Sequence, residues 1–324
     1  MLRRHTALLL LLVMSATVAG QVPPEQVGPK QVSFPSGSAI LRGTLYAPAG
    51  EGPHPAVVYA HGSAPGNLND LAFEQLGPVF VERGWVFFAP YRRGQGLSAG
   101  AGPYVGDAIA ARQRETLRRE LLPVIVVTFA MILVVGVTMR RKWRRASSAT
   151  AVTLAGALLC LVMARDARGS AIMQVLQADQ LADHRAARAW LAEQPFVDPA
   201  RIATAGNSFG GIVSVLASQQ SQYCAVIDAA GGAESWSRPV AAAMTAAVRR
   251  SRSPMFVFQA ANDFNIEPTR QLGEALRRAG RPYEARIYPA FGATNSDGHS
   301  FAWRGSAAWA DDVFRFLEAH CRPG

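Results

Sequence analysis

The feature that most constrains the fold is a G-x-S-x-G turn at Gly206–Gly210. It follows an apolar run over Ile202–Ala205 and precedes a helical pattern over Gly210–Ser218. A sharp strand–turn–helix connection of this kind leaves no room for side chains at its glycines and presents the central serine outward. The spacing therefore predicts a strand that ends at this turn, with Ser208 as a nucleophile at the strand's carboxyl end.

Runs rich in Val, Ile, Phe and Tyr alternate with helical patterns along most of the chain. Strands are expected at Gln31–Phe34, Ile40–Tyr46, Ala56–Tyr59, Trp85–Ala89, Ile202–Ala205, Ala225–Asp228, Met255–Gln259 and Ala285–Tyr288. Helices are expected at Leu71–Arg83, Ala171–Glu193, Gly210–Ser218, Arg238–Arg250, Pro268–Ala279 and Ser306–His320. This alternation predicts an α/β fold with a mostly parallel, doubly wound sheet of about eight strands and helices on both faces. The first two strands are expected to form a hairpin at its edge.

A serine nucleophile needs a base, and the base needs a carboxylate that orients it. Asp263 follows the expected strand Met255–Gln259, and His299 lies in a segment expected to be a loop after the last strand. Asp228 and Asp297 are alternative carboxylates. We favour Asp263 because its strand is the last one before the strand that leads to His299.

A serine nucleophile with such a base also needs two backbone N–H donors for the oxyanion. Phe209, directly after the nucleophile, is expected to supply one. The loop after Ala56–Tyr59 is expected to supply the other, from Ser63 or, in a different register, from Ala64. His61 in that loop is expected to hold it by hydrogen bonds, without a role in proton transfer.

The sequence leaves open the role of two arginines and the redox state of two cysteines. Arg92 and Arg93 could bind a substrate carboxylate or could be structural. Cys224 begins a strand and Cys321 ends the last helix, so both are expected at the amino edge of the sheet, either as a disulfide or as two thiols. No Cys/His cluster has zinc spacing, so no metal site is expected, and the predicted chemistry needs no cofactor.

The first 20 residues are typical of a secretory signal peptide. Arg3 and Arg4 precede an uncharged run of 12 residues, Ala7–Val18, and small residues follow before Gln21. The run is shorter than the roughly 20 residues that span a bilayer. We expect an exported protein with its catalytic domain on the periplasmic or extracellular side.

Residues 121–164 are the second unusual region. Two uncharged stretches of 19 residues, Leu121–Met139 and Ala146–Ala164, flank a basic run over Arg140–Arg145. Their length and the basic loop favour a transmembrane hairpin with the loop in the cytoplasm. The alternative is a pair of buried helices that cap a soluble domain. We treat the region as an insert in a single α/β domain, with residues 21–120 before it and 165–324 after it.

The net charge of +10 does not indicate a nucleic-acid partner. Residues 1–20 and 121–164 hold seven of the basic residues and no acidic ones, which leaves +3 for the rest of the 324-residue chain. Basic clusters beside apolar segments are instead typical of membrane topology. The sequence does not indicate an oligomeric state.

These landmarks together resemble the α/β-hydrolase superfamily, most closely its dienelactone-hydrolase-like and prolyl-oligopeptidase-like branches. The matching segments are His61–Ser63, Tyr91–Ser98, Phe196–Ile202, Gly206–Gly211, Asp263 and Gly298–His299. The chain order Ser208, Asp263, His299 is the order found in that superfamily. Dienelactone hydrolases proper use a cysteine nucleophile, whereas position 208 is serine, which favours general ester chemistry.

The resemblance implies a serine hydrolase that cleaves a small-molecule ester through an acyl-enzyme on Ser208. A peptidase of the prolyl-oligopeptidase type is the alternative among enzymes. A binding protein of the membrane or envelope that uses the same fold without catalysis is the alternative of another class.

Overall fold

The computed structural model describes residues 28–138 and 142–323, so the expected signal peptide lies outside the described residues. Eight strands form one sheet in the order β1-β2-β4-β3-β5-β6-β7-β8. They are β1 (Lys30–Ser36), β2 (Ala39–Tyr46), β3 (His54–Ala60), β4 (Val86–Pro90), β5 (Val197–Asn207), β6 (Val226–Ala229), β7 (Met255–Ala260) and β8 (Tyr283–Tyr288). Pairs from β4 to β8 are parallel, whereas β1 and β2 are antiparallel at the edge. The predicted mostly parallel sheet and its edge hairpin are confirmed.

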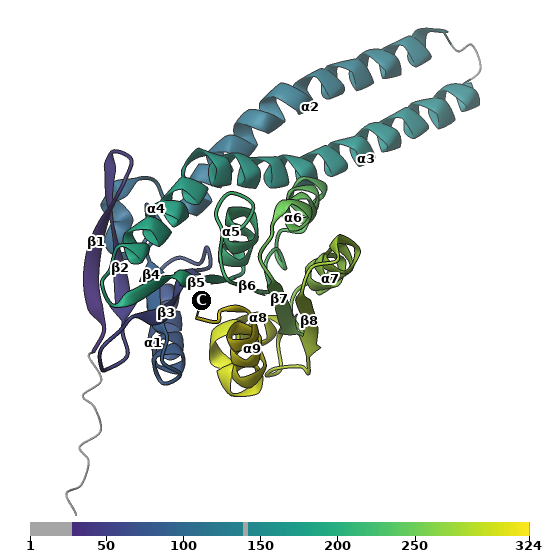
Figure 1. Cartoon of the computed structure of the whole chain (residues 1–324). Helices are drawn as coiled ribbons and strands as arrows, with labels where there is room; N and C mark the ends of the chain where they lie inside the picture. Colours follow the sequence, from purple (N-terminus) through teal and green to yellow (C-terminus); the bar gives the residue numbers. More distant parts are fainter. Residues whose placement is uncertain (1–27, 139–141, 324) are drawn as a thin grey trace, which may run out of the picture.

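Helices cover both faces of this sheet (Figure 1). They are α1 (Leu68–Val81), α4 (Leu181–Ala192), α5 (Phe209–Ala217), α6 (Arg238–Arg250), α7 (Glu267–Ala279), α8 (Asn295–Arg304) and α9 (Ser306–His320). Successive residues of β3 point to opposite faces: Val58 joins the core under α4 to α7, and Val57 joins the core under α1, α8 and α9. This period of two buries a strand on both sides, which explains why β3 is apolar throughout.

Two segments differ from expectation. The helix expected at Ala171–Glu193 is the end of α3 (Lys142–Val175), a π-helical turn at Leu176–Gln180 and then α4. The segment that carries His299 is helix α8 and not a loop, so that prediction was wrong. Its N-terminus is fixed by a capping box, in which the Thr294 side chain accepts from the Asp297 N–H and the Asp297 carboxylate accepts from the Thr294 N–H.

The insert forms two long helices, α2 (Val105–Thr138) and α3, which extend beyond residues 121–164 on both sides. They lie side by side and project away from the sheet (Figure 1). Their outer surfaces are apolar and open, with Phe129 73% and Leu161 69% exposed. Among the described residues one helical stretch, Thr150–Ala192, is long and apolar enough to cross a membrane, and 12% of its apolar window is buried. The side chains of the basic run, residues 140–145, are outside the described part.

A disulfide joins the amino edge of β6 to the end of α9. Cys224 and Cys321 are bonded across 97 residues of chain, which answers the question that the sequence left open. The remaining cysteine, Cys160 on α3, is a free thiol.

Candidate active site

The turn between β5 and α5 has the geometry that its two glycines demand. A Cβ at Gly206 would lie 2.3 Å from the Gly210 carbonyl oxygen, and a Cβ at Gly210 would lie 1.8 Å from the carbonyl oxygen of Ala60. Ser208 has φ 55° and ψ −119°, a conformation that is strained for a residue with a side chain. The serine is therefore held at the N-terminus of α5, where the helix dipole favours negative charge.

Asp263 and His299 meet at the carboxyl edge of the sheet, although 36 residues separate them. His299 Nδ1 donates a hydrogen bond of 2.8 Å to Asp263 Oδ1. The Asp263 side chain is fully buried, and the same oxygen accepts from the Phe264 N–H at 2.6 Å. Gln259 Nε2 donates to the other oxygen at 3.2 Å. These bonds fix the carboxylate and thereby the orientation of the imidazole ring.

The second ring nitrogen of His299 is buried and forms no hydrogen bond with the described residues. No hydrogen bond joins it to Ser208 Oγ in that part of the chain. Such catalytic hydrogen bonds are often long in free enzymes and shorten when substrate binds. Nε2 is the atom that a nucleophile's proton would reach, so its free lone pair is available for that transfer.

Glu234 is a neighbour of this site that the sequence analysis did not identify. Its Oε2 lies 3.6 Å from His299 Nε2, and its side chain is half exposed on the segment after β6. Burial opposes the positive charge on His299, but the hydrogen bond to Asp263 and the charges of Asp263 and Glu234 outweigh it and raise the pKa of His299. No sequence motif marks Glu234, because only the fold brings its segment to His299.

The two alternative carboxylates have other partners. Asp228 Oδ1 accepts from the Gly231 N–H at 2.9 Å, and burial raises the pKa of Asp228 to about 7. Asp297 is engaged in the capping box of α8. Of the three candidates, the structure brings only Asp263 to His299 Nδ1.

The two expected oxyanion donors lie just after the carboxyl ends of two neighbouring strands. Ser63 follows β3, and Phe209 follows β5. Phe209 begins α5, so its N–H has no partner within the helix. Neither this N–H nor that of Ser63 donates a hydrogen bond to another described residue. Both N–H groups are therefore free to bind a ligand oxygen.

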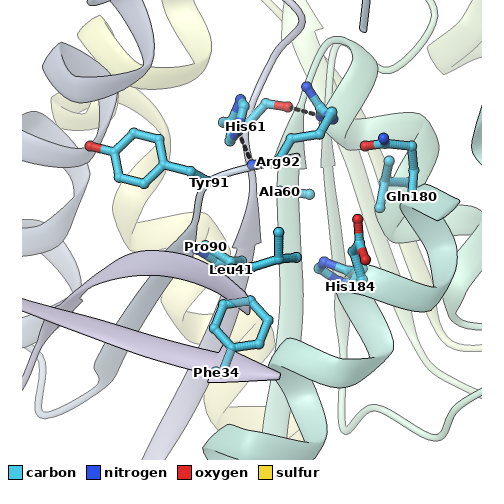
Figure 2. A pocket seen from close by; sticks show the side chains of 11 residues that line it. Phe34, Leu41, Ala60, His61, Pro90, Tyr91, Arg92, Gln180 and His184 are labelled. Atoms are coloured by element: carbon cyan, nitrogen blue, oxygen red, sulfur yellow. Dashed lines mark hydrogen bonds between the residues drawn. The ribbon is translucent and has the colours of Figure 1, made fainter. Parts of the chain in front are cut away.

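Arg92 holds the loop that carries Ser63. Its guanidinium donates to the carbonyl oxygens of His61 at 2.7 Å and Gly62 at 3.0 Å, and to Gln95 Oε1 at 2.9 Å. Figure 2 shows Arg92 beside His61, with two bonds dashed: the one from the guanidinium to the His61 carbonyl oxygen and the one from the Arg92 backbone N–H to His61 Nε2. Burial lowers the pKa of Arg92 to about 9. These contacts make Arg92 structural, one of the two roles left open by the sequence.

His61 is buried within the same network. Its Nδ1–H donates to the Gly62 carbonyl at 2.7 Å, and its Nε2 accepts from the Arg92 N–H at 2.9 Å. Burial, together with the charge of Arg92, lowers the pKa of His61 well below its usual value. Both nitrogens are thus occupied, as expected for a residue that holds the loop. The cavity drawn in Figure 2 is about 30 Å³, the size of one water molecule rather than of a substrate.

Arg93 points away from this loop. Its guanidinium donates to both oxygens of Asp183 at 2.6 Å, and Asp183 also accepts from Ser36 Oγ at 2.6 Å. Asp183 thus ties the start of α4 both to β1 and to the segment after β4 that carries Arg93. Within the described residues, no three His, Cys, Asp or Glu side chains are grouped closely enough to hold a metal ion.

Comparisons with known proteins show which family and which solved structures the chain resembles. The sequence profile of the dienelactone hydrolase family matches residues 41–319. None of the curated protein sequences matches significantly. Many solved structures share the fold.

Three of these structures illustrate the range of relatives. A Klebsiella pneumoniae protein assigned provisionally to the dienelactone hydrolases is 18% identical, with a TM-score of 0.53, 90% of this chain covered and 97% of that one. The esterase PF2001 of Pyrococcus furiosus is 12% identical, with a TM-score of 0.53 and 90% of each chain covered. The acylaminoacyl peptidase of Pyrococcus horikoshii is 15% identical, with a TM-score of 0.53; 90% of this chain aligns with 41% of that longer one. At these identities the likeness shows a shared fold.

Proposed function

Because the chain belongs to the dienelactone hydrolase family, a branch of the α/β-hydrolases, we propose that it is a serine hydrolase that cleaves esters through an acyl-enzyme on Ser208. The observation that carries this proposal is the hydrogen bond between His299 and Asp263 at the sheet edge where the strained turn holds Ser208. That pairing supplies a base with a fixed tautomer, which serine chemistry requires.

The reaction proceeds in two acyl-transfer steps. His299 Nε2 takes the proton of Ser208 as Oγ attacks the ester carbonyl, and it returns the proton to the departing alcohol. Asp263 orients the imidazole and stabilises its cation. The N–H groups of Phe209 and Ser63 stabilise the oxyanion, and each such donor typically lowers the barrier by about 3 kcal/mol. Water, activated by the same histidine, then releases the acid.

An ester substrate is favoured over a peptide by the family match, since the profile of the dienelactone hydrolase family covers residues 41–319. The chain spans 41% of the acylaminoacyl peptidase it resembles in fold. A peptidase remains the second candidate and predicts turnover of amide substrates. A binding protein predicts no turnover at all.

We further propose that the protein is exported and that the α2–α3 hairpin lies in a membrane. Large apolar side chains are exposed along both helices, for example Phe129 on α2 and Leu158 on α3. A soluble protein seldom leaves so large an apolar surface open to water. The disulfide between Cys224 and Cys321 fits an exported compartment, where disulfides persist.

Turnover of p-nitrophenyl esters and of matching anilides by the full-length protein tests the proposal. We expect ester cleavage that falls by at least about a thousandfold in Ser208→Ala, since the nucleophile is lost. Ser214→Ala, a change in the same helix, serves as the control. Equal turnover by Ser208→Ala and wild type would contradict the proposal, and faster anilide cleavage would favour the peptidase.

A further inference from the structure

A cavity of about 260 Å³ lies between the root of the α2–α3 hairpin and the segment after β6. The hairpin contributes Gln113, Arg168 and Gly169, and the domain contributes residues 233–237 and Asn265. Glu234 belongs to this wall and also lies 3.6 Å from His299 Nε2. The cavity therefore adjoins the proposed catalytic base.

The root of the α2–α3 hairpin packs closely against the rest of the domain beside this cavity. Gly169 approaches Ser237 so closely that a Cβ on it would lie 2.0 Å from Ser237 Oγ. One turn away, Arg238 Nε donates to Asp166 Oδ2 at 2.8 Å. The insert thus forms one wall of the cavity as a fixed part of the structure and does more than link the domain to an anchor.

Two polar groups of this wall lack partners in the described residues. Ser237 Oγ is buried and forms no hydrogen bond, although the side chain lines the cavity. Arg168 is exposed and forms no ion pair there. A hydroxyl donor and a guanidinium suit a ligand that presents anionic oxygens, such as a phosphate or a carboxylate.

The distance from the cavity to the apolar stretches of α2 and α3 follows from the number of helical residues between them. Gln113 precedes Leu121 by eight residues, and Gly169 follows Ala164 by five. At about 1.5 Å per helical residue, the cavity is roughly 8–12 Å from the apolar ends of the helices. The headgroup layer on each side of a bilayer is about 5–8 Å thick. A membrane around the hairpin would therefore place the cavity at the outer surface of the headgroups.

The part of α2 between the cavity and the apolar stretch is positively charged. It carries four arginines and two glutamates, at positions 112, 114, 118 and 119 and at positions 115 and 120. Glu115 pairs with Arg112 and Arg119, which leaves Arg114 and Arg118 without an ion pair in the described residues. Cationic side chains at this depth attract anionic lipids.

We infer that the enzyme takes its ester substrate from the bilayer, and that the cavity at the hairpin root holds the anionic headgroup of that lipid. This inference rests on the proposed serine hydrolase and on the membrane hairpin. Arg168 and Ser237 bind the headgroup oxygens while an acyl ester of the lipid faces Ser208. Hydrolysis breaks the acyl C–O bond; the alcohol part leaves with a proton from His299, and water releases the fatty acid.

The test uses the full-length protein in vesicles of ether-linked lipid, which has no ester to cleave. Phosphatidylglycerol and diacylglycerol with the same fluorogenic acyl chain serve as substrates, and a soluble p-nitrophenyl ester reports the basic activity. We expect Arg168→Gln to lower the ratio of kcat/KM for phosphatidylglycerol to that for diacylglycerol by about tenfold, the effect of one charge-assisted hydrogen bond. Arg168→Lys should restore much of the ratio, and Arg249→Gln, an exposed arginine on α6, should leave it unchanged.

Two outcomes would overturn the inference. One is an unchanged ratio in Arg168→Gln. The other is a wild-type protein that cleaves the soluble ester but neither lipid. A wild-type protein that cleaves none of the three would contradict the proposed function itself, and the inference with it.

Discussion

The guanidinium of Arg92 lies 4.6 Å from the centre of the Phe209 ring. The same group donates hydrogen bonds to the carbonyl oxygens of His61 and Gly62, directly before Ser63. Arg92 therefore contacts both segments that carry the proposed oxyanion donors. Its side chain is buried and engaged by these contacts, so we infer that Arg92 is a positioning residue that sets the separation of the two segments.

Arg92→Met should lower kcat on a soluble ester by about ten- to a hundredfold with little change in KM, because oxyanion donors act in the transition state. The neighbouring variant Arg93→Met is the matched control. This variant breaks the ion pair with Asp183 at the start of α4. It should lower the midpoint of thermal unfolding and leave kcat nearly unchanged. An Arg92→Met protein that is folded and keeps wild-type kcat would contradict the positioning role.

Replacing Glu234 should shift the pH dependence of kcat/KM. Its negative charge stabilises protonated His299. The proposed base is the neutral form of His299. Glu234→Gln therefore lowers the pKa of His299, and the acidic limb of kcat/KM should move to lower pH, as expected when a nearby negative charge is removed. Glu318→Gln on α9 should leave the limb in place. A limb that moves to higher pH in Glu234→Gln would contradict this account.

The disulfide should contribute to stability. Replacing Cys224 and Cys321 together with serine should lower the free energy of unfolding by about 2–5 kcal/mol, as for other native disulfides that close long loops. Denaturant unfolding checks this, with Cys160→Ser as the control that keeps the bond. A thiol count on denatured, unreduced protein should give one thiol per chain; three thiols would show that the bond is absent.

Cys160 reports on the membrane hairpin. It is a free thiol on α3, within the apolar stretch. In vesicles, a membrane-impermeant maleimide should leave it unmodified until detergent is added, because hydrocarbon shields it. Rapid modification in intact vesicles would favour the alternative in which the hairpin caps a soluble domain.

The regular elements were predictable because their patterns are local. All eight strands were expected, and Arg238–Arg250 and Ser306–His320 begin and end at the expected residues. Helix α8 was missed because Gly298 and Ser300 are poor helix formers and no long apolar period runs through it. Its stability comes from the capping box and from Phe301 in the core.

The candidate site was predictable as far as it depends on short motifs. The G-x-S-x-G turn and the order of Ser208, Asp263 and His299 can be read along the chain. Glu234 and Arg168 could not be found in this way, because only the fold brings Glu234 to His299 and places Arg168 at the adjoining cavity. The role of Arg92 was likewise open until its partners were known.

The most direct test of the account is fluorophosphonate labelling of the full-length wild type beside Ser208→Ala and His299→Ala. The account predicts labelling of the wild type at Ser208, none in Ser208→Ala, and strongly slowed labelling in His299→Ala, because the base activates the serine. A folded wild type that is not labelled, or a Ser208→Ala protein that is labelled as fast as wild type, would contradict it.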